Sequence, residues 1–255
     1  MTTKNETKLK KLFSLLQPGK VVTASWLENS GISRDLQKYY LESGWLETFG
    51  RGAYKKQGDL IEWHGALNAI QEQTNTKVHV GGLTALYLLG LSHYFRMSNE
   101  TLYLFSPRKV KLPKWYCDYN WDVEIANIQS QFLPNKLGIK HFEIKQNSVL
   151  TSVPERAIME CLFLAPQKMD LIECFHLFEG LVNLKPKLIM QLLENCSSIK
   201  VKRLFLYMAN KANHQWLQFV NLENIDIGSG NRILVEKGVY QSKYLISIPK
   251  ELVEL

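Results

Sequence analysis

Cysteine is scarce in this 255-residue sequence, and the few that occur are widely spaced. No CxxC pair is present among Cys117, Cys161, Cys174 and Cys196. Zinc knuckles and ribbons need closely spaced ligand pairs, so this spacing argues against a structural zinc site. Cys161 and Cys174 stand among apolar residues at helical spacing, which favours buried free thiols in a reducing compartment. We expect no bound metal.

Long hydrophobic runs are also absent. The longest apolar stretch, residues 83–91, is shorter than the roughly 20 residues that span a bilayer. The first residues, MTTKNETKLKK, contain no apolar segment typical of a secretion signal. The sequence therefore predicts a cytoplasmic protein that makes no membrane contact.

The sequence lacks the common enzyme motifs GxxxxGK[ST], GxGxxG after a strand, HExxH and GxSxG. One weak constellation remains, in which Asp122 precedes the Glu-x-Lys formed by Glu143 and Lys145 on adjacent predicted strands. Such a set binds Mg²⁺ and activates water in nucleases. We expect no enzymatic activity and no cofactor, and keep a Mg²⁺-dependent nuclease as an alternative.

Positive charge is what the chain does have, and it is concentrated at one end. The net charge is +7, and residues 1–58 hold ten Lys and Arg against five Asp and Glu, which is +5 and leaves +2 for the rest. A basic segment of this kind suits a module that binds a polyanion, although a solvated basic surface gives the same count. The length favours two domains, which we place at residues 1–58 and 59–255.

Residues 5–58 predict three helices and a hairpin. Apolar residues at helical spacing indicate a first helix over residues 5–16. Thr23 or Ser25 caps a short second helix, Gly31 supplies the turn, and a third helix starts at Ile32. Two short strands, residues 45–49 and 53–56, then flank Gly50-Arg51-Gly52. This order is that of a winged helix-turn-helix, whose third helix enters the major groove.

The third helix has a face suited to DNA. Its inward stripe is predicted to hold Ile32, Leu36, Tyr39 and Tyr40, and its outward face Ser33, Arg34, Gln37 and Lys38. The outward side chains can donate to phosphates and base edges. In the wing, Arg51 and Lys55 add candidate DNA contacts. A winged helix that docks a protein instead remains an alternative.

The larger domain is predicted to be α+β. Helices are expected over residues 60–74 and 83–95, and strands at residues 77–82, 100–106, 122–127 and 140–145. Ser152 and Glu155 form the pattern of a capping box, which opens a run of helices. Two strands, residues 231–236 and 243–248, are expected around Lys237-Gly238.

Two further basic clusters are candidates for a second nucleic-acid contact. The first lies in residues 107–116, where Trp115 or Tyr116 offers a stacking surface. The alternative is a solvated connection whose Trp115 packs into the core. The second cluster lies at a predicted helix start. Their members are Arg108, Lys109, Lys111 and Lys114, and Lys200, Lys202 and Arg203.

Several stretches together resemble the AbiEi family of antitoxins from type IV abortive-infection toxin–antitoxin systems. In the first module the stretch is "GISRDLQKYYLESGWLETFGRGAY". Further along they are "HVGGLTALYLLGLSHY", "SPRKVKLPKW", "VPERAIMECL", "FEGLVNLKPKLIMQLLENCSSIKVKRLFLYMA" and "IDIGSGNRILVEKGVYQSKYLISIP". The similarity extends over nearly the full length.

This resemblance implies a bifunctional protein. The winged helix would bind inverted repeats in double-stranded DNA at its own promoter and repress the operon. The larger domain would supply the antitoxin activity against a nucleotidyltransferase-like toxin, with no stable complex between the two required. The DNA-facing residues carried over are those of the third helix together with Arg51 and Tyr54. Tyr39 and Tyr40 replace the aliphatic residues expected there.

Overall fold

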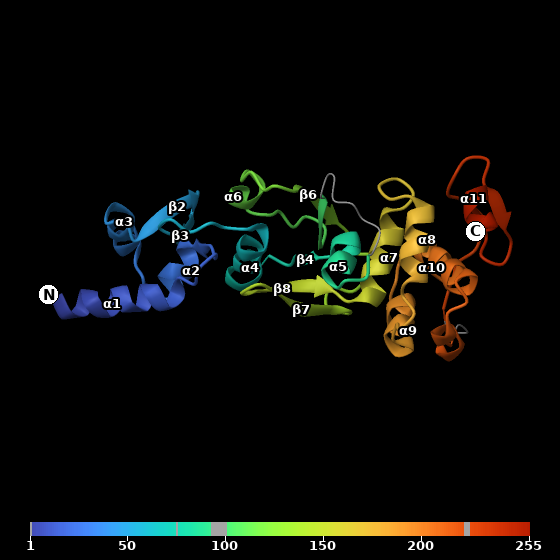
Figure 1. The fold of residues 1–255 in the computed structure, drawn as a ribbon, viewed down its shortest axis with the longest axis horizontal. Coiled ribbons are helices and arrows are strands. Elements are labelled where there is room, and N and C mark those ends of the chain that lie inside the picture. The colour runs from blue at the N-terminus through green and yellow to red at the C-terminus, as the bar shows by residue number, and fades with distance from the viewer. Residues whose placement is uncertain (1, 75, 93–100, 222–224) are drawn as a thin grey trace. The chain divides into compact units, whose positions relative to one another are not determined.

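The computed structural model describes residues 2–74, 76–92, 101–221 and 225–255 and has the predicted mixed α+β class (Figure 1). Two compact units form. One consists of residues 1–78, 109–125 and 141–150, and the other of residues 79–108, 126–140 and 151–255. The expected boundary at residue 58 stays a prediction.

The first unit begins with the predicted winged helix-turn-helix. Its helices are α1 (Thr2–Leu15), α2 (Ala24–Asn29) and α3 (Arg34–Glu42). Its strands β1 (Val22–Thr23), β2 (Leu46–Gly50) and β3 (Ala53–Lys56) form an antiparallel sheet of order β1-β3-β2. Figure 1 shows this sheet beside α2 and α3.

Side-chain caps set the helix starts in this module. The hydroxyl of Thr23 accepts a hydrogen bond from the amide of Trp26 at 3.3 Å, and that of Ser33 accepts from Leu36 at 3.4 Å. Gly31 adopts a φ of 87°, which the turn between α2 and α3 requires. The third helix therefore starts at Arg34 rather than at Ile32, since Ser33 is its N-cap.

The core of the module is small and apolar. It consists of Leu12, Leu16, Val22, Leu27, Ile32, Tyr40 and Leu46. The expected inward position of Tyr39 is wrong, because its side chain is 57% exposed while the neighbouring Tyr40 is buried. Burying two consecutive residues on one face of a helix is geometrically difficult.

A five-stranded sheet follows, with order β6-β5-β4-β8-β7. Its strands are β4 (His79–Val80), β5 (Thr101–Ser106), β6 (Glu124–Gln129), β7 (Ile139–Ile144) and β8 (Asn147–Ser152). β4 pairs antiparallel with β5 and parallel with β8. The four strands expected here are confirmed, and β8 was not predicted. Helix α4 (Trp63–Gln73) belongs to the first unit and helix α5 (Gly82–Leu88) to the second. Both helices were expected. Of the helix predicted over residues 83–95, residues 93–95 lie outside the described residues.

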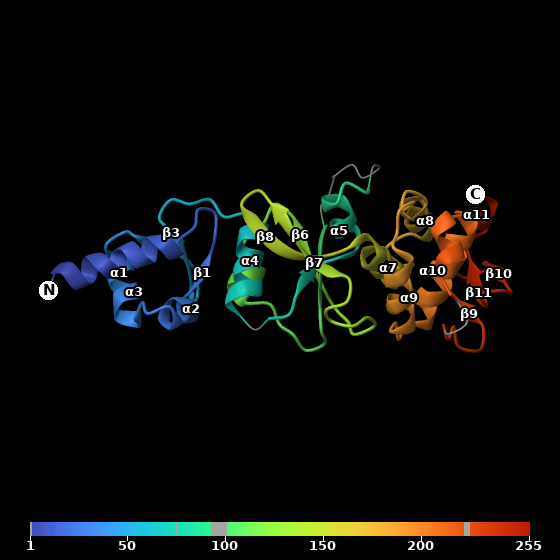
Figure 2. The ribbon, with the colours of Figure 1, turned by 90° about the horizontal axis from the view of Figure 1, so that it is seen from below.

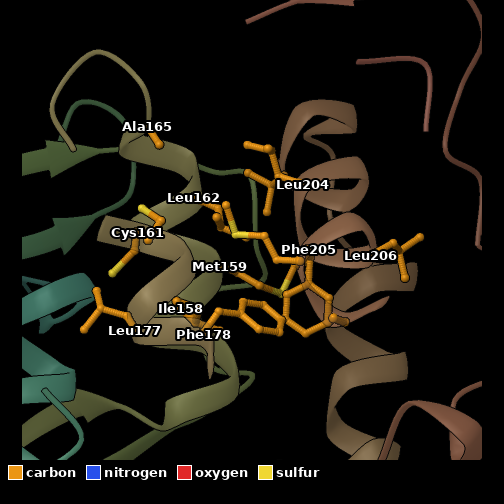
Figure 3. Close-up of a cluster of buried hydrophobic side chains, with 14 of the residues drawn as sticks. Ile158, Met159, Cys161, Leu162, Ala165, Leu177, Phe178, Leu204, Phe205 and Leu206 are labelled. Atoms are coloured by element: carbon orange, nitrogen blue, oxygen red, sulfur yellow. The ribbon is translucent and has the colours of Figure 1, made fainter. Parts of the chain in front are cut away.

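Four helices contain most of the second unit's core. They are α7 (Pro154–Leu164), α8 (Leu171–Glu179), α9 (Pro186–Glu194) and α10 (Ile199–Lys211), and α7 contacts the other three (Figures 1 and 2). Figure 3 shows Ile158, Met159 and Leu162 of α7 pointing towards Leu204 and Phe205 of α10. The cysteines are free, and burial raises the pKa of Cys174 to about 12.

The expected capping box at the start of α7 is wrong. Val153 is the N-cap and has no side-chain cap, although Pro154 does occupy the first turn. The hydroxyl of Ser152 donates to Glu160 at 2.8 Å, and the carboxylate of Glu155 accepts from the amide of Lys185 at 2.8 Å. Both groups that would form the box are therefore committed to distant partners.

The C-terminal segment forms three short strands where two were expected. β10 (Val239–Gln241) pairs antiparallel with β11 (Ile246–Ile248), and β9 (Arg232–Ile233) pairs parallel with β11. A 3₁₀ helix (Gln215–Phe219) precedes the strands and α11 (Lys250–Glu254) follows them. The parallel pairing of β9 separates it from the expected hairpin.

Candidate nucleic-acid interface

Two cations stand on the exposed face of α3. The side chains of Arg34 and Lys38 are 54% and 78% exposed. Each contacts an acid: Arg34 Nε lies 2.8 Å from Glu28 Oε2, and Lys38 Nζ lies 3.9 Å from Glu42 Oε1. Ion pairs this exposed contribute about 0–1 kcal/mol, so both cations can be redirected to a phosphate at little cost.

Gln37 does not belong to this face, and its expected outward orientation is wrong. Its side chain is 1% exposed. The amide nitrogen donates to the carbonyl of Ala24 at 3.0 Å and to that of Ile32 at 2.8 Å. Gln37 therefore joins α3 to α2 and to the turn between them, at a position where apolar residues are usual.

The wing presents Arg51 at its tip. Arg51 is exposed between Gly50 and Gly52, and Gly52 adopts a φ of 75°. Tyr54 is half-buried in the central strand, where it pairs with both Val22 and Thr48. Arg51 is thus the wing residue with the most freely presented charge.

Lys55 lies in the same strand but is committed within the chain. Its Nζ lies 3.2 Å from Glu47 and donates to the carbonyl of Asp59 at 2.8 Å. The amide of Gly58 and then Lys55 lower the pKa of Glu47, which keeps that carboxylate ionised. The charge of Lys55 is therefore largely compensated.

The end of β2 next to the wing tip packs on α6 (Lys114–Cys117). The strand ladder shifts register between Thr48 and Gly50, and the ring of Phe49 lies 6.0 Å from that of Trp115 and stacks on Tyr119 at 4.6 Å. A Cβ added at Gly50 would lie 2.6 Å from the Cβ of Trp115. Glycine is therefore required where the wing meets α6.

Two alternatives were open for the aromatic residues of the 107–116 segment, an exposed stacking surface and packing in the core. The structure shows that Trp115 and Tyr116 are buried. Trp115 is 8% exposed and Tyr116 is 0% exposed, so neither offers a stacking surface. The basic side chains around them point outward. Those exposed are Arg108, Lys109, Lys111 and Lys114. Lys114 begins α6 and thus stands beside the residue that contacts the wing.

The second basic cluster was expected at the surface, and for two of its three members that position is wrong. Lys202 is 5% exposed and donates to the carbonyl of Asp226 at 2.9 Å. Arg203 is completely buried and donates to four carbonyls at 2.7–3.1 Å, those of Ile227, Gly228, Gly230 and Leu245. Lys200 is half-buried and donates to the carbonyls of Phe163 and Ala165.

The residues of the alternative nuclease do not converge. Glu143 lies on β7 and Asp122 just precedes β6, and these strands are opposite edges of the five-stranded sheet. Four strand spacings separate them, about 19 Å. Lys145 is paired with Glu62. Among the described residues no group of three or more His, Cys, Asp or Glu side chains could hold a metal ion.

A buried charge cluster that the sequence did not reveal centres on Glu160. Its carboxylate accepts from His79 at 2.9 Å, Arg156 at 2.7 Å and the amide of Gly82 at 2.9 Å. Burial alone would raise the pKa of Glu160, but the charges of His79 and Arg156 outweigh it and lower the pKa to about 2. The cluster joins β4, β8 and the start of α5 to α7. It is closed to solvent, so its role is structural.

Comparison with known proteins gives two family matches. The family described as "Transcriptional regulator, AbiEi antitoxin, Type IV TA system" matches residues 99–249, and "Transcriptional regulator, AbiEi antitoxin N-terminal domain" matches residues 5–97. Among solved structures, the RV2827C protein from Mycobacterium tuberculosis is similar, with a TM-score of 0.54 and 14% identity over 89% of this chain and 85% of that one. At this identity the likeness concerns the fold. No curated protein matches. None of the described helices has the length and apolar character needed to cross a membrane.

Proposed function

We propose that the chain binds inverted repeats in its own promoter and represses the operon. The proposal rests on its family: matches over both parts of the chain show that it belongs to the AbiEi antitoxins and transcriptional regulators of type IV toxin–antitoxin systems. Its second role is neutralisation of a nucleotidyltransferase-like toxin without a stable complex. The family membership predicted from the sequence is confirmed. Operator binding and the identity of the toxin are proposals.

The observation that carries the DNA-binding role is the set of exposed cations on α3 and on the wing of one winged helix. Arg34 and Lys38 lie one helical turn apart on α3, and Arg51 stands at the wing tip. In this fold α3 enters the major groove while the wing contacts phosphates or the minor groove. Ser33 is exposed beside Arg34 and can donate its hydroxyl proton to a phosphate while its oxygen caps the helix.

Lys111 and Lys114 are proposed to extend this surface. Both are exposed, and α6 packs through Trp115 on Phe49, next to the wing tip. Phosphate contacts beside the wing would add affinity without adding sequence specificity. Tyr54 and Lys55 are kept as secondary contacts, since one is half-buried and the other is paired with Glu47.

The division of labour follows the proposed boundary. Residues 1–58 form the DNA-binding module and residues 59–255 supply the antitoxin activity. Neither role requires catalysis by this chain. Because the proposed operator is chromosomal DNA, we also propose that the protein acts in the cytoplasm.

The test is a double variant, Arg34→Ala with Lys38→Ala, which removes both cations from α3. Phosphate-dominated binding makes the logarithm of affinity fall linearly with the logarithm of salt concentration. We expect the wild type to bind its upstream DNA with such a slope and the double variant to lose binding. The matched control, Lys136→Ala with Lys140→Ala, removes two exposed charges from the second unit and should bind as the wild type does.

A growth-rescue assay, in which the toxin encoded by the adjacent gene is expressed, separates toxin neutralisation from operator binding. The double variant should still protect cells, and residues 60–255 alone should retain protection. A flat salt response, or no mobility shift with the upstream DNA, would contradict the DNA-binding role and favour a docking adaptor. Loss of both activities in a folded double variant would contradict separable roles.

A further inference from the structure

An open pocket of about 490 Å³ lies in the second unit. Its wall includes Arg108, Lys200 and Arg232, together with the hydroxyl-bearing Ser130, Ser197 and Ser198. No carboxylate is among the described residues that line it. The volume falls within the range of small-molecule sites, roughly 300–1,000 Å³.

The wall of the pocket is built around the start of α10. The hydroxyl of Ser198 caps this helix by accepting from the amide of Val201 at 3.4 Å. The amide of Ser197 donates to the carbonyl of Phe132 at 2.9 Å and so holds the helix start against the segment after β6. Because Ser198 and Ile199 line the pocket, the positive end of the α10 dipole adds to the charge of the side chains.

The three cations differ in what they are free to do. Lys200 donates to the carbonyls of Phe163 and Ala165 at the end of α7, and burial lowers its pKa. It therefore serves mainly to hold the wall. Arg108 and Arg232 are exposed, and within the described part of the chain neither side chain makes a hydrogen bond or ion pair. Two guanidinium groups without a partner thus border one pocket.

A guanidinium presents a planar set of donors that matches the oxygens of a phosphate. Two guanidinium groups, three hydroxyls and a helix start line one pocket of about 490 Å³, which gives donors for the oxygens of more than one linked phosphate group. Phe163 also borders a second pocket of about 320 Å³, whose lining includes Asn127 and Gln167. Amide side chains hydrogen-bond the edges of bases.

We propose that the pocket bordered by Arg108 and Arg232 binds a polyphosphate group. Two sources share this chemistry: a nucleoside triphosphate, whose base would occupy the second pocket, and free inorganic polyphosphate. None of the residues that line this pocket is among those proposed to contact the operator.

Isothermal titration of the full chain with inorganic triphosphate and with ATP tests the proposal. We expect binding by the wild type and a loss of about tenfold or more in the variant Arg108→Ala with Arg232→Ala, because two charge-assisted contacts disappear. Since neither side chain has a partner in the described chain, thermal melting of this variant should match the wild type. Tighter binding of ATP identifies a nucleotide, and equal binding identifies the phosphates alone as the ligand.

Two controls locate the binding. Lys187→Ala removes an exposed charge from α9, and Arg34→Ala with Lys38→Ala removes the cations of α3; both should bind triphosphate as the wild type does. Absence of binding to the wild type, or equal binding by the pocket variant, would overturn the proposal. Weaker operator binding by the pocket variant without any triphosphate binding would also overturn it and would assign the two arginines to DNA.

Discussion

Arg34 Nε lies 2.8 Å from Oε2 of Glu28, and this pair sets an acid from α2 against the strongest candidate DNA contact on α3. Both side chains are about half exposed, so water screens their attraction. A phosphate that approaches Arg34 must displace the carboxylate and also meets its negative charge. Glu28 therefore limits operator affinity under the proposed function.

Replacing Glu28 by Gln should raise operator affinity by about fivefold at low salt, because the competing charge is removed. The free energy of unfolding should change by less than about 1 kcal/mol, as an exposed ion pair contributes little. Fluorescence anisotropy with labelled operator DNA measures the first and urea denaturation the second. Glu194→Gln makes the same charge change on α9; an equal gain there would show that net charge, rather than Arg34, is responsible.

Replacing Gln37 by Met should lower the free energy of unfolding by about 1–2 kcal/mol, because two buried hydrogen bonds to Ala24 and Ile32 are lost. Relative affinities for operators with single base changes should stay the same, since the amide does not reach solvent. Tyr40→Phe is the control: its buried hydroxyl has no partner among the described residues, so stability should stay equal or rise. A changed base preference in the Gln37 variant would contradict the buried role.

Replacing Gly50 by Ala should displace α6 from the wing, since the new Cβ would lie 2.6 Å from the Cβ of Trp115. Overpacking of this kind costs about 1–3 kcal/mol. Operator affinity should fall as well, because Arg51 follows the displaced strand. Urea denaturation and anisotropy measure both effects. At Gly180 an added Cβ would meet its nearest neighbour at 3.5 Å, so Gly180→Ala should leave both quantities unchanged.

Glu160 should give the protein a specific acid sensitivity. Its pKa is lowered from 4.5 to about 2 in the folded chain, so its carboxylate stabilises the fold fully above about pH 4.5 and progressively less towards pH 2. Glu160→Gln should be less stable by about 3 kcal/mol or more at pH 7, because His79 and Arg156 lose their acid. Urea denaturation at several pH values should show that the difference between variant and wild type narrows below pH 4.5. A constant difference would contradict this role.

Local periodicity was enough to predict the winged helix, because its helices are short, amphipathic and separated by glycine turns. The rotation of α3 was harder. Ser33 is the cap rather than a helical residue, and a glutamine fills an inward position by donating to two carbonyls. Polarity suggested that Gln37 faces solvent, and only the partners supplied by α2 and the turn show otherwise.

In the larger domain, too, side-chain positions depend on hydrogen-bond partners that the local sequence does not reveal, and these partners lie further away along the chain. Ser152 and Glu155 have the spacing of a capping box, yet their partners are Glu160 and Lys185. The cations Lys202 and Arg203 suggested a surface, whereas their acceptors lie 24 or more positions away along the chain. β8 escaped prediction because Asn147, Ser148 and Thr151 weaken its apolar alternation. In each case the deciding partner is set by tertiary structure.

Among the described residues, the hydrogen bonds of the buried Arg203 guanidinium all go to main-chain oxygens, and every amino acid supplies such an oxygen. Side chains at the four accepting positions can therefore vary over evolution without loss of the anchor, wherever the backbone path allows it. Gly228 and Gly230 restrict this freedom, because both adopt positive φ angles. Related chains can thus diverge widely in the loop that follows α10 and still close it onto the same helix, as long as they keep an arginine at this one place.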